Sequence, residues 1–180
     1  MKKIVICLLL TIASSTGYSQ INVDSLKHIT ISKDIPSDDI LNAYYALCNF
    51  YTYSSSDSLY KYAQRGLKFA QENEHVKEFS AFYNAIGKSY AQKNNHDSAY
   101  YFFNQAIDLA VKYDSKGKEA NVYYDIADME ARRGNHTVQL ENLIKAASIY
   151  EQIDQKNNYI NALSSIGSVY NVVGNKEKAF

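Results

Sequence analysis

Apolar residues along most of the chain recur every three to four positions, the spacing that places them on one face of an α-helix. Ile107, Ala110 and Val111 follow this spacing, and Ala99 to Ala106 continue the same stripe one turn back. A shorter amphipathic stretch, Val23 to Ile31, is expected to cover the first helical hairpin. The pattern, interrupted by short polar turns, predicts seven helices, near residues 38–53, 57–73, 76–93, 97–113, 116–133, 137–153 and 156–173.

The helical pattern itself repeats every forty residues. The segment from Asn84 to Tyr90 (NAIGKSY) returns eighty residues later as SSIGSVY, and the turns stay in phase without a gap. Each period predicts two helices, so the chain is expected to be an all-α solenoid of antiparallel helix hairpins. One column of mostly small residues, where two helices are expected to approach closely, consists of Leu47, Gly87, Ala127 and Gly167.

Residues suited to helix ends flank several of these segments. Asp57, Asp97 and Thr137 stand where helices are expected to begin, and their side-chain oxygens are candidates to accept unpaired backbone N–H groups. Gly134 and Gly174 follow the ends of first helices, where a left-handed backbone conformation favours glycine.

The repeating columns resemble the tetratricopeptide repeat, whose first helix carries an aromatic residue, Leu-Gly and Tyr, and whose second helix carries Ala, Phe and Ala. The best unit here has these residues at Tyr83, Ile86, Gly87, Tyr90, Ala99, Phe103 and Ala106. The resemblance covers about residues 40–180. It implies a right-handed solenoid and a protein or peptide partner on the concave face. Glu130 and Gln139 depart from the pattern and place the local packing of the third unit in question.

The period of forty is longer than the usual 34 residues of that family. Long-period arrays of this kind resemble the extracytoplasmic regions of signalling proteins from Bacteroidetes-type bacteria, in which a histidine kinase or helix-turn-helix output follows. This resemblance implies that the chain is the N-terminal part of a longer sensor, or else the product of a truncated gene. The alternative is a stand-alone secreted or periplasmic scaffold that assembles with its own copies or neighbours.

The first nineteen residues have the three parts of a secretory signal peptide. Lys2 and Lys3 are basic, an apolar run follows from Ile4 to Ile12, and small or polar residues lead to a cleavage position before Gln20. The expected organisation is therefore a signal peptide over 1–19, an N-terminal capping segment over 20–37, and a repeat array over 38–180. The units of the array are expected near 40–75, 76–115, 116–155 and 156–180, the last one incomplete, and the location is periplasmic or otherwise extracytoplasmic.

Composition narrows the classes of function. Lys and Arg number 19 and so do Asp and Glu, so no basic excess indicates a nucleic-acid partner for this segment. Two cysteines, one of them inside the signal peptide, exclude an intramolecular disulfide in the mature chain. Contact with a membrane is expected only through the signal peptide or a downstream segment.

The inward-facing positions of the resembled family predict a polar groove on the first helices. The candidate groove residues are Tyr44, Asn84, Lys88, Tyr124, Asp128 and Ser164, with Cys48 and Ser168 in the same columns. Tyr and Asn side chains suit the recognition of a peptide, although these residues are equally consistent with an ordinary solvated surface.

No residue set indicates catalysis, a cofactor or a metal, and we expect a non-enzymatic protein. His96 and His136 occupy the same turn position in successive units, but no further ligands complete a metal shell. Asp125 and Asp128 could share a helix face, yet no nucleophile accompanies them. Cys48 is interpreted as a packing residue.

Overall fold

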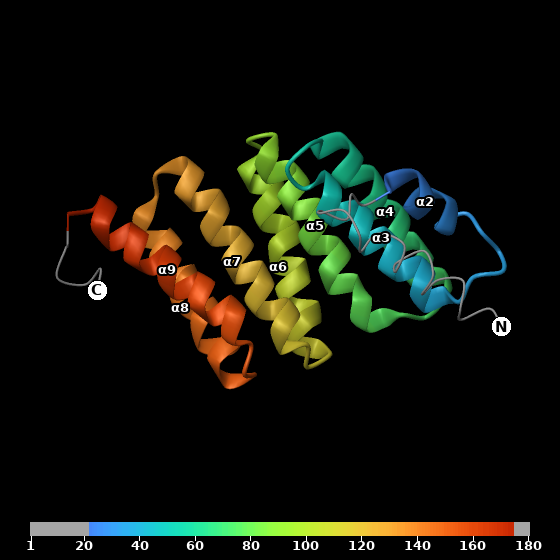
Figure 1. The fold of residues 1–180 in the computed structure, drawn as a ribbon. Helices are drawn as coiled ribbons and strands as arrows, with labels where there is room; N and C mark the ends of the chain where they lie inside the picture. The colour runs from blue at the N-terminus through green and yellow to red at the C-terminus, as the bar shows by residue number, and fades with distance from the viewer. Residues whose placement is uncertain (1–21, 175–180) are drawn as a thin grey trace, which may run out of the picture.

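The computed structural model describes residues 22–174, which form a row of antiparallel helices running from α2 at one end to α9 at the other (Figure 1). The helices are α2 (Val23–Ile29), α3 (Ser37–Tyr51), α4 (Ser56–Glu72), α5 (Phe79–Gln92), α6 (His96–Lys112), α7 (Lys116–Arg133), α8 (His136–Gln152) and α9 (Lys156–Val172), with a 3-10 turn, η1 (Val76–Glu78), before α5. No strand occurs within the described range.

The helices pack in chain order, which is the arrangement of an α-solenoid. Each helix contacts the next one along the chain, α2 packs on α3, and α5 also contacts α7 directly. The first helices of the hairpins, α3, α5, α7 and α9, therefore form one layer, and α4, α6 and α8 form the other. The predicted all-α solenoid of helix hairpins is confirmed. The predicted signal peptide, residues 1–19, and the last six residues, 175–180, lie outside the described residues.

The turns repeat at half the period seen in the sequence. From the turn after α4 onward, each turn contains one residue with a left-handed backbone conformation, with φ between 50° and 79°. These residues are twenty positions apart: Glu74, Asn94, Asp114, Gly134, Asp154 and Gly174. The residue after each of the first five is the N-cap of the next helix. The predicted left-handed glycines at 134 and 174 are confirmed, and four non-glycine residues adopt the same conformation.

The starts of α3, α4, α6 and α8 come one residue earlier than predicted, those of α7 and α9 agree, and α5 begins at Phe79, after η1. Asp57, Asp97 and Thr137 do not cap the helices but lie in their first turns. The caps come two residues earlier: the Ser55 side chain accepts from the N–H of Ser58, Asn95 from that of Ser98, and Asn135 from that of Val138. At Asn95 and Asn135 the cap directly follows a left-handed residue, and its side chain folds back over the exposed amides; Ser54, before the Ser55 cap, is not left-handed.

The core between successive helices depends on two glycines facing aromatic rings. A Cβ atom at Gly66 of α4 would lie 2.2 Å from the Phe82 ring of α5, and one at Gly87 of α5 would lie 2.6 Å from the Phe103 ring of α6. Both rings are fully buried. The predicted close approach at Gly87 is confirmed, and it holds the layer of first helices against the layer of second helices.

Candidate functional site

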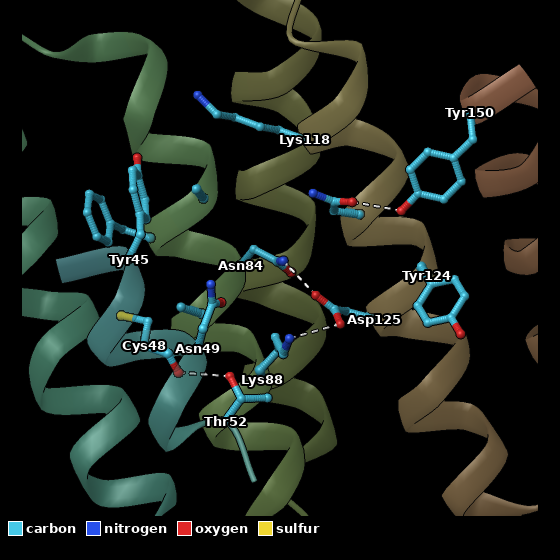
Figure 2. Close-up of a pocket in the computed structure, with 14 residues that line it drawn as sticks. Tyr45, Cys48, Asn49, Thr52, Asn84, Lys88, Lys118, Tyr124, Asp125 and Tyr150 are labelled. Carbon is cyan, nitrogen blue, oxygen red and sulfur yellow. Dashed lines mark hydrogen bonds and ion pairs between the residues drawn. The ribbon is translucent and has the colours of Figure 1, made fainter. Parts of the chain in front are cut away.

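A groove of about 310 Å³ runs across the layer of first helices, where α3, α5 and α7 lie side by side. Its polar lining consists mainly of carboxamides and phenols, with two lysines and one aspartate (Figure 2). The lining residues are Tyr45, Cys48, Asn49, Thr52, Ala81, Phe82, Asn84, Ala85, Lys88, Lys118, Asn121, Tyr124, Asp125 and Tyr150. Such a mixture of apolar floor and convergent polar groups is typical of a binding site.

The centre of the groove is a hydrogen-bonded network around Asp125 of α7. One carboxylate oxygen accepts from Asn84 Nδ2 at 2.7 Å, and the other lies 3.1 Å from Lys88 Nζ (Figure 2). Both donors come from α5, so the network ties the second unit to the third. Asn84 Oδ1 is buried and has no hydrogen-bond partner among the described residues. An amide oxygen of this kind is able to accept an N–H from a ligand.

One end of the groove is closed by a second network that joins three units. Tyr45 of α3 donates to Glu78 Oε2 and stacks on Phe82, with ring centroids 4.6 Å apart. Lys118 of α7 pairs with Glu78 Oε1 at 2.9 Å and donates to the carbonyl of Lys77 at 2.6 Å. Burial and the hydrogen bond to Glu78 raise the pKa of Tyr45 far above its usual range. Burial opposes ionisation of Glu78, but the donors Tyr45 and Lys118 hold the pKa of this carboxyl below its ordinary value.

Further hydrogen bonds between first helices join residues about one period apart. Gln92 of α5 donates to the carbonyl of Thr52 at the end of α3, and the hydroxyls of Tyr124 and Ser165 lie 3.2 Å apart between α7 and α9. These contacts cross the concave layer and fix the spacing of its helices. The groove is therefore formed before any ligand arrives.

The structure brings three of the six candidate groove residues together. Asn84, Lys88 and Tyr124 line the groove. Tyr44 does not: it is 7% exposed and packs on α4, with its ring centroid 5.9 Å from that of Phe69. Asp128 lies beside an adjacent, much narrower hollow and pairs with Arg132 at 3.1 Å.

The remaining candidates, Ser164, Ser168 and Cys48, do not share one location. Ser164 is exposed on α9, outside the groove lining, and the hydroxyl of Ser168 donates to its backbone carbonyl. Cys48 does line the groove, but it is buried, and this burial raises the pKa of the thiol to about 12 despite the nearby Lys88. A thiol of this kind is protonated at neutral pH and a poor nucleophile.

Sequence reasoning missed ten of the fourteen lining residues as groove positions, among them Tyr45, Asn49, Asn121 and Asp125. Tyr45 and Asp125 belong to one column, forty residues on either side of Ala85, which also lines the groove. That column is one position after the column of Tyr44, and one residue rotates a helical side chain by about 100°. The sequence signal that could have identified these groove positions is this column of Tyr45, Ala85 and Asp125, spaced forty residues apart.

The other clusters weighed in the sequence are dispersed. Asp125 lies in the groove, whereas Glu130 is buried between α6 and α7, so the carboxylates of this segment do not converge. His96 and His136 begin successive second helices. Between residues 22 and 174, no group of three or more His, Cys, Asp or Glu side chains could hold a metal ion. No helix in that range is long and apolar enough to cross a membrane.

The fold is similar to that of solved helical proteins. BtubC (BKLC) from P. vanneervenii aligns with a TM-score of 0.63 and 16% identity, covering 87% of this chain and 65% of that one. A Rap protein complexed with Competence and Sporulation Factor aligns with a TM-score of 0.65 and 16% identity, covering 89% of this chain and 41% of that one. The chain thus spans less than two thirds of the length of either structure.

At this level of identity, the likeness shows the fold alone. The class it supports is a helical-repeat α-solenoid. No protein-family model matches the chain, and no curated protein matches it either. Membership of the tetratricopeptide family, and of its long-period type, therefore stays a prediction from the columns of the sequence.

Proposed function

We propose that this chain is a non-catalytic interaction module that binds a peptide, or a peptide segment of a protein, in the groove between α3, α5 and α7. The observation that carries the proposal is the pre-formed groove with a buried, unpartnered amide oxygen on Asn84 at its centre. A peptide backbone supplies both N–H donors and C=O acceptors, and side-chain amides such as Asn84, Asn49 and Asn121 match both.

Two features support a binding role over a catalytic one. Both oxygens of Asp125 are held by donors of α5, which favours a fixed carboxylate over a mobile general base. The Cys48 thiol is deactivated by burial. The Rap protein of similar fold was solved in complex with Competence and Sporulation Factor, which is compatible with a solenoid of this shape presenting a binding surface.

A groove-filling variant tests the proposal. Ala81 lines the groove from α5, and Ala81→Trp would occupy it without removing any hydrogen bond of the two networks. Peptides selected from a random display library against the unmodified protein are expected to lose binding to Ala81→Trp. They should retain binding to Asn104→Trp, which adds the same bulk at an exposed position of α6, away from the groove. Selected peptides that bind both variants equally would contradict a site in the groove.

We further propose that the module acts outside the cytoplasm, as the N-terminal part of a longer sensor protein. The support is the signal-peptide pattern of the first nineteen residues and the resemblance to extracytoplasmic arrays. An alkaline phosphatase reporter fused after residue 174 should be active in a bacterial host only when residues 1–19 are present. Sequencing beyond the Phe180 codon tests whether the module belongs to a longer sensor protein, for which a membrane span and an output domain are expected.

The alternative, a scaffold that binds its own copies, is favoured by one observation on α9. Ile160 and Leu163 are 60% and 45% exposed on this helix, which is the last one described. Exposed aliphatic residues of this kind favour association. Sedimentation that shows a concentration-dependent dimer, abolished by Leu163→Glu, would support the scaffold, and a monomer at all concentrations would argue against it.

A further inference from the structure

The hydrogen-bonding groups that line the groove are unequally used. The acceptors are largely occupied from within: Asp125 accepts from Asn84 and Lys88, and Asn121 Oδ1 accepts from the Tyr150 hydroxyl at 2.7 Å. Glu78, at the end of the groove, is engaged by Tyr45 and Lys118. The acceptor capacity that remains for a ligand therefore lies mainly in the side-chain amide oxygens of Asn84 and Asn49.

The donors, by contrast, are in excess. A lysine ammonium has three N–H groups, and within the described residues Lys88 is paired with one carboxylate, that of Asp125. Asn121 uses its oxygen for Tyr150, so its amide nitrogen remains as a donor, and Asn49 of α3 adds a second, exposed amide to the lining. A site whose donors exceed its acceptors complements a ligand with an excess of acceptors.

The placement of the two lysines sharpens this chemistry. Figure 2 shows Lys118 toward one end of the groove and Lys88 toward the other, with Asn84 and Asp125 between them. Each lysine side chain is only 25% exposed, so its remaining N–H groups are partly withdrawn from water. Charge-assisted hydrogen bonds are shorter and stronger than neutral ones in such surroundings. Lys118 is paired with Glu78 and Lys88 with Asp125, so Lys88 is the lysine whose partner lies inside the groove lining.

We propose, building on the peptide-binding function above, that the groove selects an extended segment with an acidic side chain, whose carboxylate sits at Lys88. The peptide backbone donates to Asn84 Oδ1 and accepts from the carboxamide nitrogens. Asp125 competes with the ligand for Lys88, and this intramolecular competitor sets the affinity. The Lys118 end, already neutralised by Glu78, contributes shape and backbone contacts more than charge.

Two substitutions with opposite expected effects test the assignment. Lys88→Gln removes the ammonium and should weaken binding of an acidic peptide about tenfold. Asp125→Asn removes the competitor, keeps the shape of the side chain and should strengthen binding severalfold. A variant that merely unfolds is unable to gain affinity, so the second substitution separates recognition from stability. Lys68→Gln, on the exposed surface of α4, is the matched control and should change nothing.

The probes are three pools of fluorescein-labelled decapeptides with a central Glu, Lys or Gln and randomised flanks, followed by fluorescence anisotropy. The Glu pool should bind most tightly, lose affinity with added salt, and fail to bind Ala81→Trp. Equal or tighter binding of the Gln or Lys pool in the groove would overturn the acidic preference but leave the peptide-binding function intact. No binding of any pool, or binding undiminished by Ala81→Trp, would overturn both.

Discussion

The hairpins α5–α6 and α7–α8 occupy equivalent places in the repeat, yet they fill the same contact with different residues. In α5–α6, Gly87 faces the ring of Phe103, and even a Cβ atom there would lie 2.6 Å from it. Forty residues later the corresponding pair is Ala127 and Leu143, both buried. The first helix gains a methyl group where the second loses an aromatic ring. The repeat therefore preserves the fit between helices and not the individual residues.

A second position shows the same principle with polar groups. Tyr90 of α5 stacks on Phe102 at 5.4 Å and meets Tyr60 of α4 edge to face at 5.6 Å. Its counterpart forty residues later is Glu130, which is fully buried and accepts from Arg133 Nη1 at 2.6 Å. The position that contacts neighbouring helices through aromatic rings in α5 thus holds a carboxylate in α7, paired within its own helix. The pattern departure at Glu130 does not interrupt the hairpin, because Arg133 compensates its charge.

The largest expected effect comes from breaking the glycine–aromatic fit. Gly87→Leu should lower the free energy of unfolding by about 3 kcal/mol, because the Phe103 ring and the Ala99 carbonyl leave no room for a side chain. Urea denaturation followed by circular dichroism measures the loss. An unchanged midpoint would show that this contact does not hold the hairpin together.

A double substitution sharpens the same comparison. Gly87→Ala combined with Phe103→Leu recreates in α5–α6 the pair that α7–α8 already uses. The two changes should couple favourably, so that the double variant is at least about 1 kcal/mol more stable than the sum of the single losses predicts. Additive losses would mean that the two hairpins differ in backbone spacing and are not interchangeable.

The ionic contact is expected to contribute less than the aromatic fit. Glu130→Gln keeps the size of the side chain but removes the charge that Arg133 compensates, and it should cost about 1–2 kcal/mol. Glu141→Gln, at an exposed position of α8, is the control and should stay close to the unmodified protein. If the two variants are equally stable, the charge of the buried Glu130 carboxylate does not contribute to the free energy of unfolding.

These contacts explain why the sequence predicted the architecture well. Columns forty residues apart record the contacts between neighbouring helices, which recur in every unit, so Gly87 and the helix ranges could be found without coordinates. The helix starts were displaced by one residue because Asp57 and Asp97 are good caps in isolation, whereas the turn geometry gives that role to Ser55 and Asn95. At Asn95 the left-handed residue before the cap, Asn94, places the start of the helix.

The groove could be predicted only in part. Asn84, Lys88 and Tyr124 were found, but on α3 the structure uses Tyr45 in place of Tyr44. Two adjacent tyrosines carry the same chemistry, so the sequence pattern gave no basis for choosing between them, although they point about 100° apart. The ring of Phe82 settles the choice by stacking on Tyr45, a contact between residues 37 positions apart.

The turns on either side of α7 offer a smaller test of the comparison. Gly134 and Asp114 both adopt left-handed backbone conformations, with φ of 72° and 50°. Gly134→Ala should cost about 1 kcal/mol from backbone strain alone, because no atom within 4 Å would contact the added methyl group. Asp114→Gly should instead stabilise the protein by up to about 1 kcal/mol, whereas Asp114→Ala should not. Thermal unfolding measures the stability of all three variants. A gain in stability for Asp114→Ala would mean that removal of the Asp114 charge, and not relief of backbone strain, stabilises the protein.

The smallest expected effect concerns the phenol that faces the ionic contact. Burial and the nearby Glu130 carboxylate raise the pKa of Tyr100 to about 12, above the value of about 10 in an unfolded chain. The neutral phenol therefore stabilises the fold fully below pH 10, and this contribution is lost as the pH rises from about 10 to about 12. Tyr100→Phe should make the decline of the free energy of unfolding with pH shallower in that window, by less than about 1 kcal/mol because the ring is partly exposed. Tyr53→Phe, at a position that is 92% exposed, should leave the slope unchanged. A slope that is identical in both variants would mean that the Tyr100 hydroxyl of α6 does not contribute to the contact with Glu130 of α7.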